Sequence, residues 1–241
     1  GYYFPGQAIM EFLDNLPRTK RYCDVVAQIE DRILIMTHDD RLDMRLVEHE
    51  KKFGIRSTFF LLSYLMDAKP SLYEGLDIQL HFDKAYSTIE RQVAEFQSKS
   101  ERKPIMNRTH RLYWRSDFID LAFLALNEFV LDCTMVGFTP YKLCVKGRIL
   151  PIWEVPVSIS DEPSDGRLIS SWNPAYDVEQ LFAHDVKPIV ASCHPRSTLE
   201  ERNLQTNFER ICELKERYDY ESLTMTEFYE RYLEKVLNSS G

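Results

Sequence analysis

Several side chains of catalytic type come directly after short apolar segments of this sequence. The clearest case is "ILIMTHDD", residues 33–40, in which four apolar residues lead toward Asp39 and Asp40. Two adjacent carboxylates at the end of a buried strand repel each other and lose hydration, so they require a cation or a shared proton. The other polar groups in equivalent places are Arg108 and the imidazoles of His81, His110 and His194.

These residue types together suggest metal-assisted hydrolysis. One carboxylate with imidazoles forms a ligand set for zinc or a similar divalent ion that keeps a position open for water, and a second carboxylate could take a proton from that water. Taken singly, each residue also has a structural reading. His81 could be a satisfied core histidine, the two aspartates a helix cap and its solvated neighbour, and Arg108 the partner of a nearby acid. The occurrence of all these groups at strand ends favours a metal-dependent hydrolytic site over the separate structural roles.

Apolar runs that predict buried strands alternate with segments that predict helices. Strands are expected at residues 32–37, 56–62, 76–82, 103–109, 130–138, 149–159 and 187–193. Helices are expected at residues 43–54, 87–102, 116–129, 198–218 and 224–237, the last capped by Thr224 with Glu227 three residues on. This alternation favours a parallel sheet, open or closed into a barrel, whose strand ends share one face. Residues 160–174 contain two prolines and one glycine and predict the longest loop.

The composition of the chain limits the classes of protein to which it can belong. The chain has 241 residues, 44% of them hydrophobic, and we expect one domain over residues 1–241. The net charge of −8 argues against a protein that tracks nucleic-acid phosphates. No apolar run approaches the roughly 18 residues of a membrane span, and the first residues lack a signal-peptide pattern, which favours the cytoplasm without fixing a compartment. Five scattered cysteines without a CxxC pair predict reduced thiols, and nothing in the sequence indicates an oligomeric state.

Two segments of the chain are similar to the opening of a known family. "THDD" with "FGIRSTFFLL" about fifteen residues later resembles the polysaccharide deacetylases, the NodB-like carbohydrate esterases, whose opening reads TFDD followed by a helix and a segment such as YGVKATFF. The resemblance continues through "DIQLHFD" at the family's histidine motif, "NRTHRLYW" at its arginine motif, "LPIWEVPVSISD" before its active-site loop, and "IVASCHP" at its last histidine motif. It therefore covers about residues 30–230.

The resemblance implies an α/β fold, a distorted (β/α) barrel of about seven parallel strands, and the metal-dependent removal of an acyl group, N-acetyl above all, from a carbohydrate. Position by position, it implies that Asp39 is the general base, that Arg108 orients this base, and that His194 is the general acid. Asp40 and His81 would bind the metal. Zinc is the expected ion, with cobalt, nickel or iron as alternatives, because supply decides metal identity as much as ligands do. The sugar and the acyl group stay undefined.

One departure from the family pattern affects the metal site. The family's second histidine, four residues after the first, is replaced here by Ala85. His110 could supply the missing ligand from the neighbouring strand, Asp83 could do so locally, or the site could have decayed. We favour His110, which gives the ligand set Asp40, His81 and His110. A decayed site would instead leave a catalytically inactive domain that serves as a glycan-binding or structural module.

Four aromatic residues and two further histidines complete the sequence predictions. Aromatic side chains at the carboxyl ends of strands could stack on sugar rings or pack in the core: Tyr113, Trp114, Trp153 and Trp172. His38 is expected beside the core, because it alternates away from Asp39 on a strand, and His184 is expected at the surface.

Overall fold

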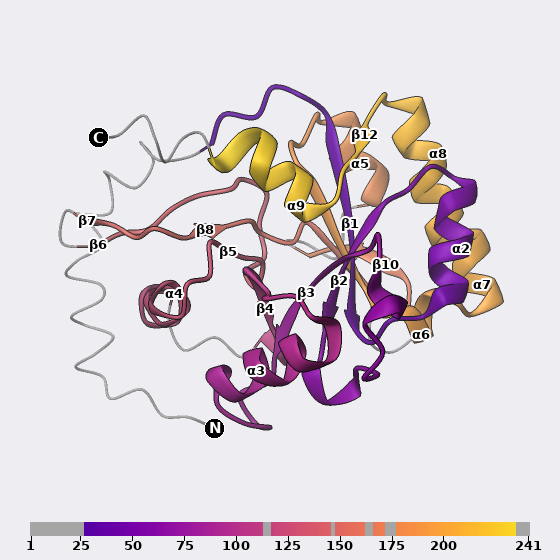
Figure 1. Ribbon diagram of the computed structural model, residues 1–241. Helices are drawn as coiled ribbons and strands as arrows, with labels where there is room; N and C mark the ends of the chain where they lie inside the picture. Colours follow the sequence, from indigo (N-terminus) through magenta and orange to yellow (C-terminus); the bar gives the residue numbers. More distant parts are fainter. Residues whose placement is uncertain (1–26, 113–116, 146–147, 162–165, 172–176, 235–241) are drawn as a thin grey trace.

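The computed structural model describes residues 27–112, 117–145, 148–161, 166–171 and 177–234 (Figure 1). Within these residues, the strands are β1 (Ile33–Asp40), β2 (Ser57–Leu61), β3 (Asp77–Phe82), β4 (Met106–Thr109), β5 (Leu131–Asp132), β6 (Cys144–Val145), β7 (Arg148–Ile149), β8 (Trp153–Glu154), β9 (Ile159–Asp161), β10 (Leu168–Ser170), β11 (Ile189–Cys193) and β12 (Glu221–Ser222). Ten of these described strands form one sheet in the order β10-β9-β11-β1-β2-β3-β4-β5-β8, with β12 beside β1, and β6 and β7 form a separate hairpin.

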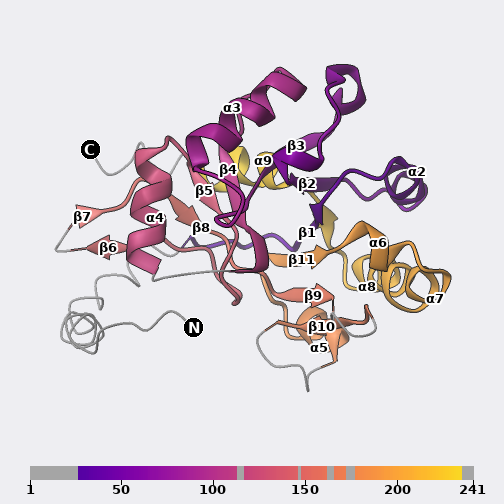
Figure 2. The same cartoon turned by 90° about the horizontal axis from the view of Figure 1, so that it is seen from below.

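Helices surround the sheet (Figure 2). They are α2 (Met44–Lys52), α3 (Ile89–Ser100), α4 (Asp117–Leu126), α5 (Val178–Ala183), α6 (Pro195–Thr198), α7 (Glu201–Asn203), α8 (Glu209–Arg217) and α9 (Met225–Phe228). Single helical turns cover residues 63–65, 70–73 and 110–112, and wider π turns cover residues 204–208 and 229–233. The expected capping box is present, because the Thr224 hydroxyl accepts from the Glu227 backbone N–H and the Glu227 carboxylate accepts from that of Thr224. No helix among the described residues is long and apolar enough to cross a membrane.

The predicted parallel α/β architecture is confirmed, with one change in strand number. Adjacent pairs from β9 through β11, β1 to β5 and β8 are all parallel. Along this path the described sheet has eight strands, one more than the seven predicted runs, because residues 149–159, predicted as one strand, contribute both β8 and β9, while Ile149 belongs to β7 in the separate hairpin. Pro151 and Pro156 lie in this segment, and a proline cannot donate to a strand ladder.

The same segment explains why the sheet curls. β8 pairs with β5 near one edge of the sheet order, and β9 pairs with β11 near the other. Only residues 155–158 connect β8 to β9, and within them Val157 bridges Val136 in a parallel sense. A link this short brings the two edges together, so the sheet must bend into a distorted barrel.

The prediction of one long loop at residues 160–174 is partly wrong. Leu168–Ser170 form β10, which pairs antiparallel with β9 so that Ser170 lies opposite Ile159. The apolar pair Leu168 and Ile169 extends along the edge of the sheet, and the prolines of this segment at positions 163 and 174 lie outside the described residues.

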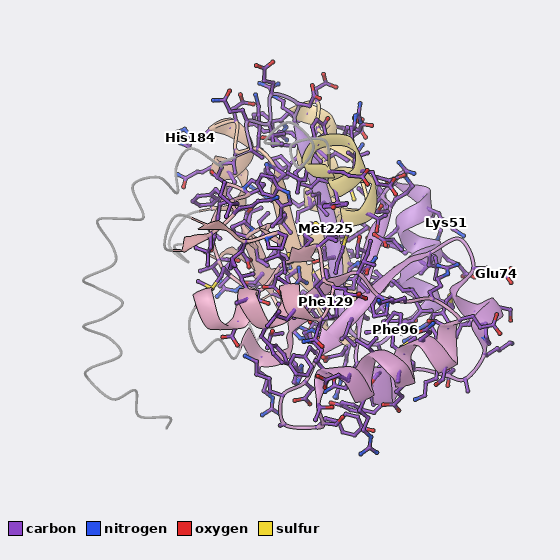
Figure 3. The ribbon with its side chains drawn as sticks, turned by 60° about the vertical axis from the view of Figure 1, so that its left-hand side comes forward. Lys51, Glu74, Phe96, Phe129, His184 and Met225 are labelled. Carbon is purple, nitrogen blue, oxygen red and sulfur yellow. The ribbon has the colours of Figure 1, made fainter. Side chains whose placement is uncertain are left out.

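Both faces of the central strand, β1, are buried, which explains the unbroken apolar run at residues 33–36. Ile33 and Ile35 pack in the barrel interior with residues such as Phe60, while Leu34 and Met36 pack on the outside with α5 and α8. Figure 3 shows Phe96 and Met225 within the packed body of the protein and Lys51, Glu74 and His184 at its outside, in agreement with the predicted surface position of His184. Side chains alternate between the two faces of β1, so Thr37 and Asp39 share the interior face with Ile33 and Ile35 and point into the barrel near the end of the strand.

Candidate active site

Three of the predicted residues gather where β1, β3 and β4 end. Asp40 closes β1 in a left-handed backbone conformation with φ of 74°, His81 lies near the end of β3, and His110 follows β4 directly. The Asp40 Oδ1 atom lies 3.7 Å from His81 Nε2 and 3.5 Å from His110 Nδ1, and these two nitrogens are 3.0 Å apart. The structure therefore brings one carboxylate and two imidazoles to a single point.

These three side chains fit a divalent ion. Tetrahedral zinc with bonds of about 2.0–2.1 Å places its ligand atoms roughly 3.3 Å apart, close to the separations found here. The Asp40 Oδ1 atom is buried and has no hydrogen-bond partner among the described residues. His81 donates from Nδ1 to the Arg108 carbonyl oxygen at 3.0 Å, which leaves Nε2 free for the ion. Burial lowers the pKa of His81 to about 4, so its imidazole is neutral, as a ligand must be.

Asp39 is held by a fully buried arginine. Arg108 Nη1 donates to Asp39 Oδ1 at 2.6 Å and also contacts the hydroxyl oxygens of Thr37 at 2.8 Å and Ser192 at 3.0 Å. Its Nε donates to the Cys133 carbonyl oxygen at 2.9 Å. Burial alone would raise the pKa of Asp39, but Arg108, with His81 and His194, lowers it to about 2. Asp39 is therefore an oriented, ionised carboxylate beside the three-residue cluster.

His194 has an acidic partner that the sequence analysis did not select. Its Nδ1 lies 3.0 Å from both carboxylate oxygens of Asp161, and its backbone N–H donates to Asp161 Oδ2 at 2.9 Å. The hydrogen bond to Asp161 raises the pKa of His194 to about 9. The free Nε2 lies 3.9 Å from Asp40 Oδ2, so His194 presents a protonated imidazole to the cluster. Asp161 also ends a strand, so the rule that selected the other groups could have selected it.

Two other candidates, Asp83 and Trp153, are not part of this cluster. Asp83 accepts hydrogen bonds from the Tyr64 hydroxyl at 3.1 Å and from the Ala85 backbone N–H at 2.8 Å, and it is outside the three-residue cluster. Trp153 is fully buried and cannot stack on a sugar. The remaining aromatic candidates, Tyr113, Trp114 and Trp172, lie outside the described residues.

The predicted core position of His38 is confirmed. The side chain is fully buried and its Nε2 lies 2.7 Å from the Glu50 carboxylate on α2. The Ser57 hydroxyl donates to the same carboxylate oxygen at 2.6 Å. This contact anchors the end of β1 to α2, on the opposite side of the strand from Asp39.

Comparison with known proteins finds solved structures that are similar to this protein in fold. No protein-family model matches the sequence, and no curated protein matches it. A candidate polysaccharide deacetylase from Mycobacterium smegmatis has a TM-score of 0.63 at 16% identity, over 88% of this chain and 94% of the other. The Bc1960 peptidoglycan N-acetylglucosamine deacetylase has a TM-score of 0.52 at 12% identity, over 88% and 95% of the two chains. The peptidoglycan deacetylase PdaC from Bacillus subtilis, in a mutant form, has a TM-score of 0.50 at 12% identity, over 88% and 98%. At these identities the likeness concerns architecture, and the chain has the fold of the polysaccharide deacetylases in a divergent version.

Proposed function

We propose that this protein is a metal-dependent hydrolase that removes an acyl group, N-acetyl above all, from a carbohydrate. The observation that carries the proposal is the meeting of three units at one end of the barrel. These are the cluster of Asp40, His81 and His110, the Asp39 carboxylate held by Arg108, and the His194 imidazole held by Asp161. The proposal is also supported by the fold, which is that of proteins described as polysaccharide and peptidoglycan deacetylases.

Each unit has a chemical role in acyl transfer to water. A divalent ion on Asp40, His81 and His110 would supply Lewis acidity to the acyl carbonyl and to water. Asp39 accepts a proton from the attacking water, and Arg108 fixes the direction of the accepting carboxylate. His194 donates its proton to the leaving amine or alcohol, and its raised pKa keeps that proton available at neutral pH. The general base and the general acid are thus separate groups with opposite pKa shifts.

The position of His110 favours an active enzyme over an inactive, glycan-binding domain. The inactive reading rests on the absence of the family's second histidine after His81. In this protein the His110 imidazole, directly after the neighbouring strand β4, lies 3.0 Å from His81 and completes a set of one carboxylate and two imidazoles. A decayed site would not be expected to keep a matching replacement.

Metal content and acetate release together test the proposal. We expect about one equivalent of a transition metal in the wild type, measured by elemental mass spectrometry, little in Asp40→Ala, and a reduced content in His110→Ala. Asp83→Ala is the matched control and should keep its metal, because Asp83 lies outside the cluster. The wild type should release acetate from at least one of a panel of acetylated sugars. No metal in any variant, even after reconstitution with zinc or cobalt, would favour the inactive domain.

The pH profile tests the pairing of Asp161 with His194. His194 must be protonated to act as the acid, so kcat/KM should fall as the pH rises through its pKa of about 9. In Asp161→Asn the imidazole loses its anionic partner, and the alkaline limb should move toward the ordinary histidine pKa of roughly 6.5. The exposed His184 offers a control, since His184→Ala should leave the profile unchanged. Identical alkaline limbs in the wild type and Asp161→Asn would exclude His194 as the acid.

A further inference from the structure

Two fully buried carboxyl groups, those of Asp132 and Glu154, have no role in the chemistry described above. Asp132 ends β5 and Glu154 ends β8, and the pairing of these parallel strands sets the two residues side by side. The next residues, Cys133 and Val155, pack in the barrel interior, so the two carboxyl groups lie on the outer face of the sheet. On its other side β5 adjoins β4, the strand that precedes His110 (Figure 2).

The two carboxyl groups hold one proton between them. They hydrogen-bond to each other, and such a bond requires that one of the two is protonated. Burial raises the pKa of both groups, and the charge of Asp132 raises that of Glu154 further. Glu154 Oε2 is buried and no described group donates to it, so this oxygen carries the proton. The pair therefore bears a single negative charge, on Asp132.

The carboxyl pair holds the segment that follows β5, residues 133–135. Glu154 Oε1 accepts from the backbone N–H groups of Thr134 at 3.1 Å and Met135 at 3.0 Å. Asp132 Oδ2 accepts from the same Thr134 N–H at 3.2 Å. Buried N–H groups at the end of a strand need acceptors once the strand ladder stops, and the pair supplies them here. Segment 133–135 is thus fixed to β8 as well as to β5.

Arg108 is the first active-site group that segment 133–135 holds. Its Nε donates to the Cys133 carbonyl oxygen at 2.9 Å, and its Nη2 donates to Cys133 Sγ at 3.0 Å. Burial raises the pKa of Cys133 to about 11, so the sulfur accepts as a neutral thiol. The remaining nitrogen, Nη1, donates to Asp39 at 2.6 Å. Cys133 therefore fixes the rotation of the guanidinium and, through it, the direction of the Asp39 carboxylate.

The backbone before His110 is the second group that is held. The Thr109 N–H donates to the hydroxyl oxygen of Thr134 at 2.9 Å, and Thr109 directly precedes His110. On the same strand, Asn107 Nδ2 donates to Asp132 Oδ1 at 2.6 Å. All four of these partners are buried. The end of β4 is therefore bonded both to the carboxyl pair and to the segment that the pair fixes.

We propose that Asp132 and Glu154 are positioning residues for the active site, which share one proton and, through segment 133–135, fix Arg108 and the backbone that carries His110. Neither residue touches the reacting groups. Because the shared proton leaves one charge instead of two, the pair stays buried without a counter-cation and still accepts from the segment. The consequence for turnover depends on the proposed deacetylase function, whereas the contacts themselves do not.

A conservative variant distinguishes this role from simple packing. Glu154→Gln keeps an oxygen for the two backbone N–H groups and a donor toward Asp132, as the protonated acid does. Glu154→Ala removes both and should lower kcat about 10²-fold with a smaller change in KM, because small displacements of catalytic groups have effects of this size. Glu154→Gln should restore most of that kcat. The exposed Glu74→Ala is the control and should match the wild type.

Two spectroscopic measurements do not depend on turnover. The infrared difference spectrum between the wild type and Glu154→Gln at pH 7 should contain the C=O stretch of a protonated carboxylic acid. The Arg108 Nε–H should exchange slowly with water in nuclear magnetic resonance spectra of the wild type and Glu154→Gln. In Glu154→Ala its exchange should be at least about tenfold faster, because the carbonyl that accepts from it is no longer held.

A second set of variants tests the connection to His110. Thr134→Val keeps the shape of the side chain but removes the acceptor for the Thr109 N–H, whereas Thr134→Ser keeps that acceptor. Zinc affinity, measured against a competing chelator, should fall about tenfold in Thr134→Val and stay near that of the wild type in Thr134→Ser. Thermal melting verifies that each variant folds, and if Glu154→Ala does not, the Thr134 variants and the infrared band decide.

The outcomes separate failure of the positioning role from failure of the proposed function. Without an infrared band that Glu154→Gln removes, the shared proton is refuted. A folded Glu154→Ala with wild-type kcat and slow Arg108 exchange would overturn the positioning role, as would equal losses of kcat in Glu154→Gln and Glu154→Ala. A wild type that binds no metal and hydrolyses nothing, but shows the band and the Glu154-dependent exchange, would refute the hydrolase and leave the positioning of Arg108 in place.

Discussion

Asp39→Asn should lower turnover by about 10²–10⁴-fold while leaving the metal content unchanged. An amide has nearly the shape of the carboxylate but cannot accept a proton at neutral pH, so the variant loses the base and keeps the geometry. Asp40, His81 and His110 are untouched and should bind the ion as before. Acetate release and elemental analysis of the same preparation measure the two quantities side by side.

The control for this variant is another aspartate close by. Asp43 caps α2 by accepting from the Arg45 backbone N–H at 3.0 Å, and asparagine is an equally good cap. Asp43→Asn should therefore retain full turnover. Because Asp39→Asn leaves Arg108 without its carboxylate partner, thermal melting must show that the variant is folded at the assay temperature. A folded Asp39→Asn with activity within tenfold of wild type would rule out Asp39 as the base.

Arg108→Met should destabilise the protein by about 3–5 kcal/mol at pH 7. The arginine is fully buried, pairs with Asp39 at 2.6 Å, and lies with its guanidinium carbon 4.4 Å above the Phe60 ring. Methionine fills much of the space but leaves the Asp39 carboxylate buried with the Ser192 hydroxyl, at 3.1 Å, as its remaining donor among the described side chains. Urea unfolding followed by circular dichroism measures the loss.

The pH dependence of this effect has a definite sign. In the wild type the pKa of Asp39 is about 2, below the roughly 3.9 of an unfolded chain. The pair's contribution is therefore fully present above pH 4 and is lost as the pH falls from about 4 to about 2. Without Arg108, burial should raise the pKa of Asp39 above 3.9, so the variant should become more stable as the pH falls toward 4.

Two further variants control the measurement. Arg45→Met removes an exposed arginine from a pair with Asp43 and should change stability by less than about 0.5 kcal/mol. The double variant Asp39→Asn with Arg108→Met should recover part of the lost stability, because it removes both buried charges. Additive losses in the double variant would show that the two side chains do not depend on each other.

The sequence by itself determined the order of the elements and the identity of most groups that meet in the site. Unbroken apolar runs such as residues 33–36 are what a strand with two buried faces requires, and the alternation with amphipathic helices then specifies a parallel sheet. Because all parallel strands end on one face, Asp39, Asp40, His81, Arg108 and His194 could be grouped without knowledge of any distance. Local signals such as the Thr224 capping box were equally readable, since they depend on residues three apart.

Only the tertiary structure decided which of these groups touch. The sequence offered both His110 and Asp83 as the third ligand and could only favour His110. The pairing of β3 with β4 sets His81 opposite Arg108, and His110, two residues further on, then lies 3.0 Å from His81. The pairing of Asp161 with His194 depends on β9 lying next to β11, although β9 follows β8 in sequence. That neighbourhood exists because the short link between β8 and β9 curls the sheet until its edges meet. Contacts between strands far apart in the chain are set by sheet order and closure, and these are properties of the whole fold that no single segment encodes.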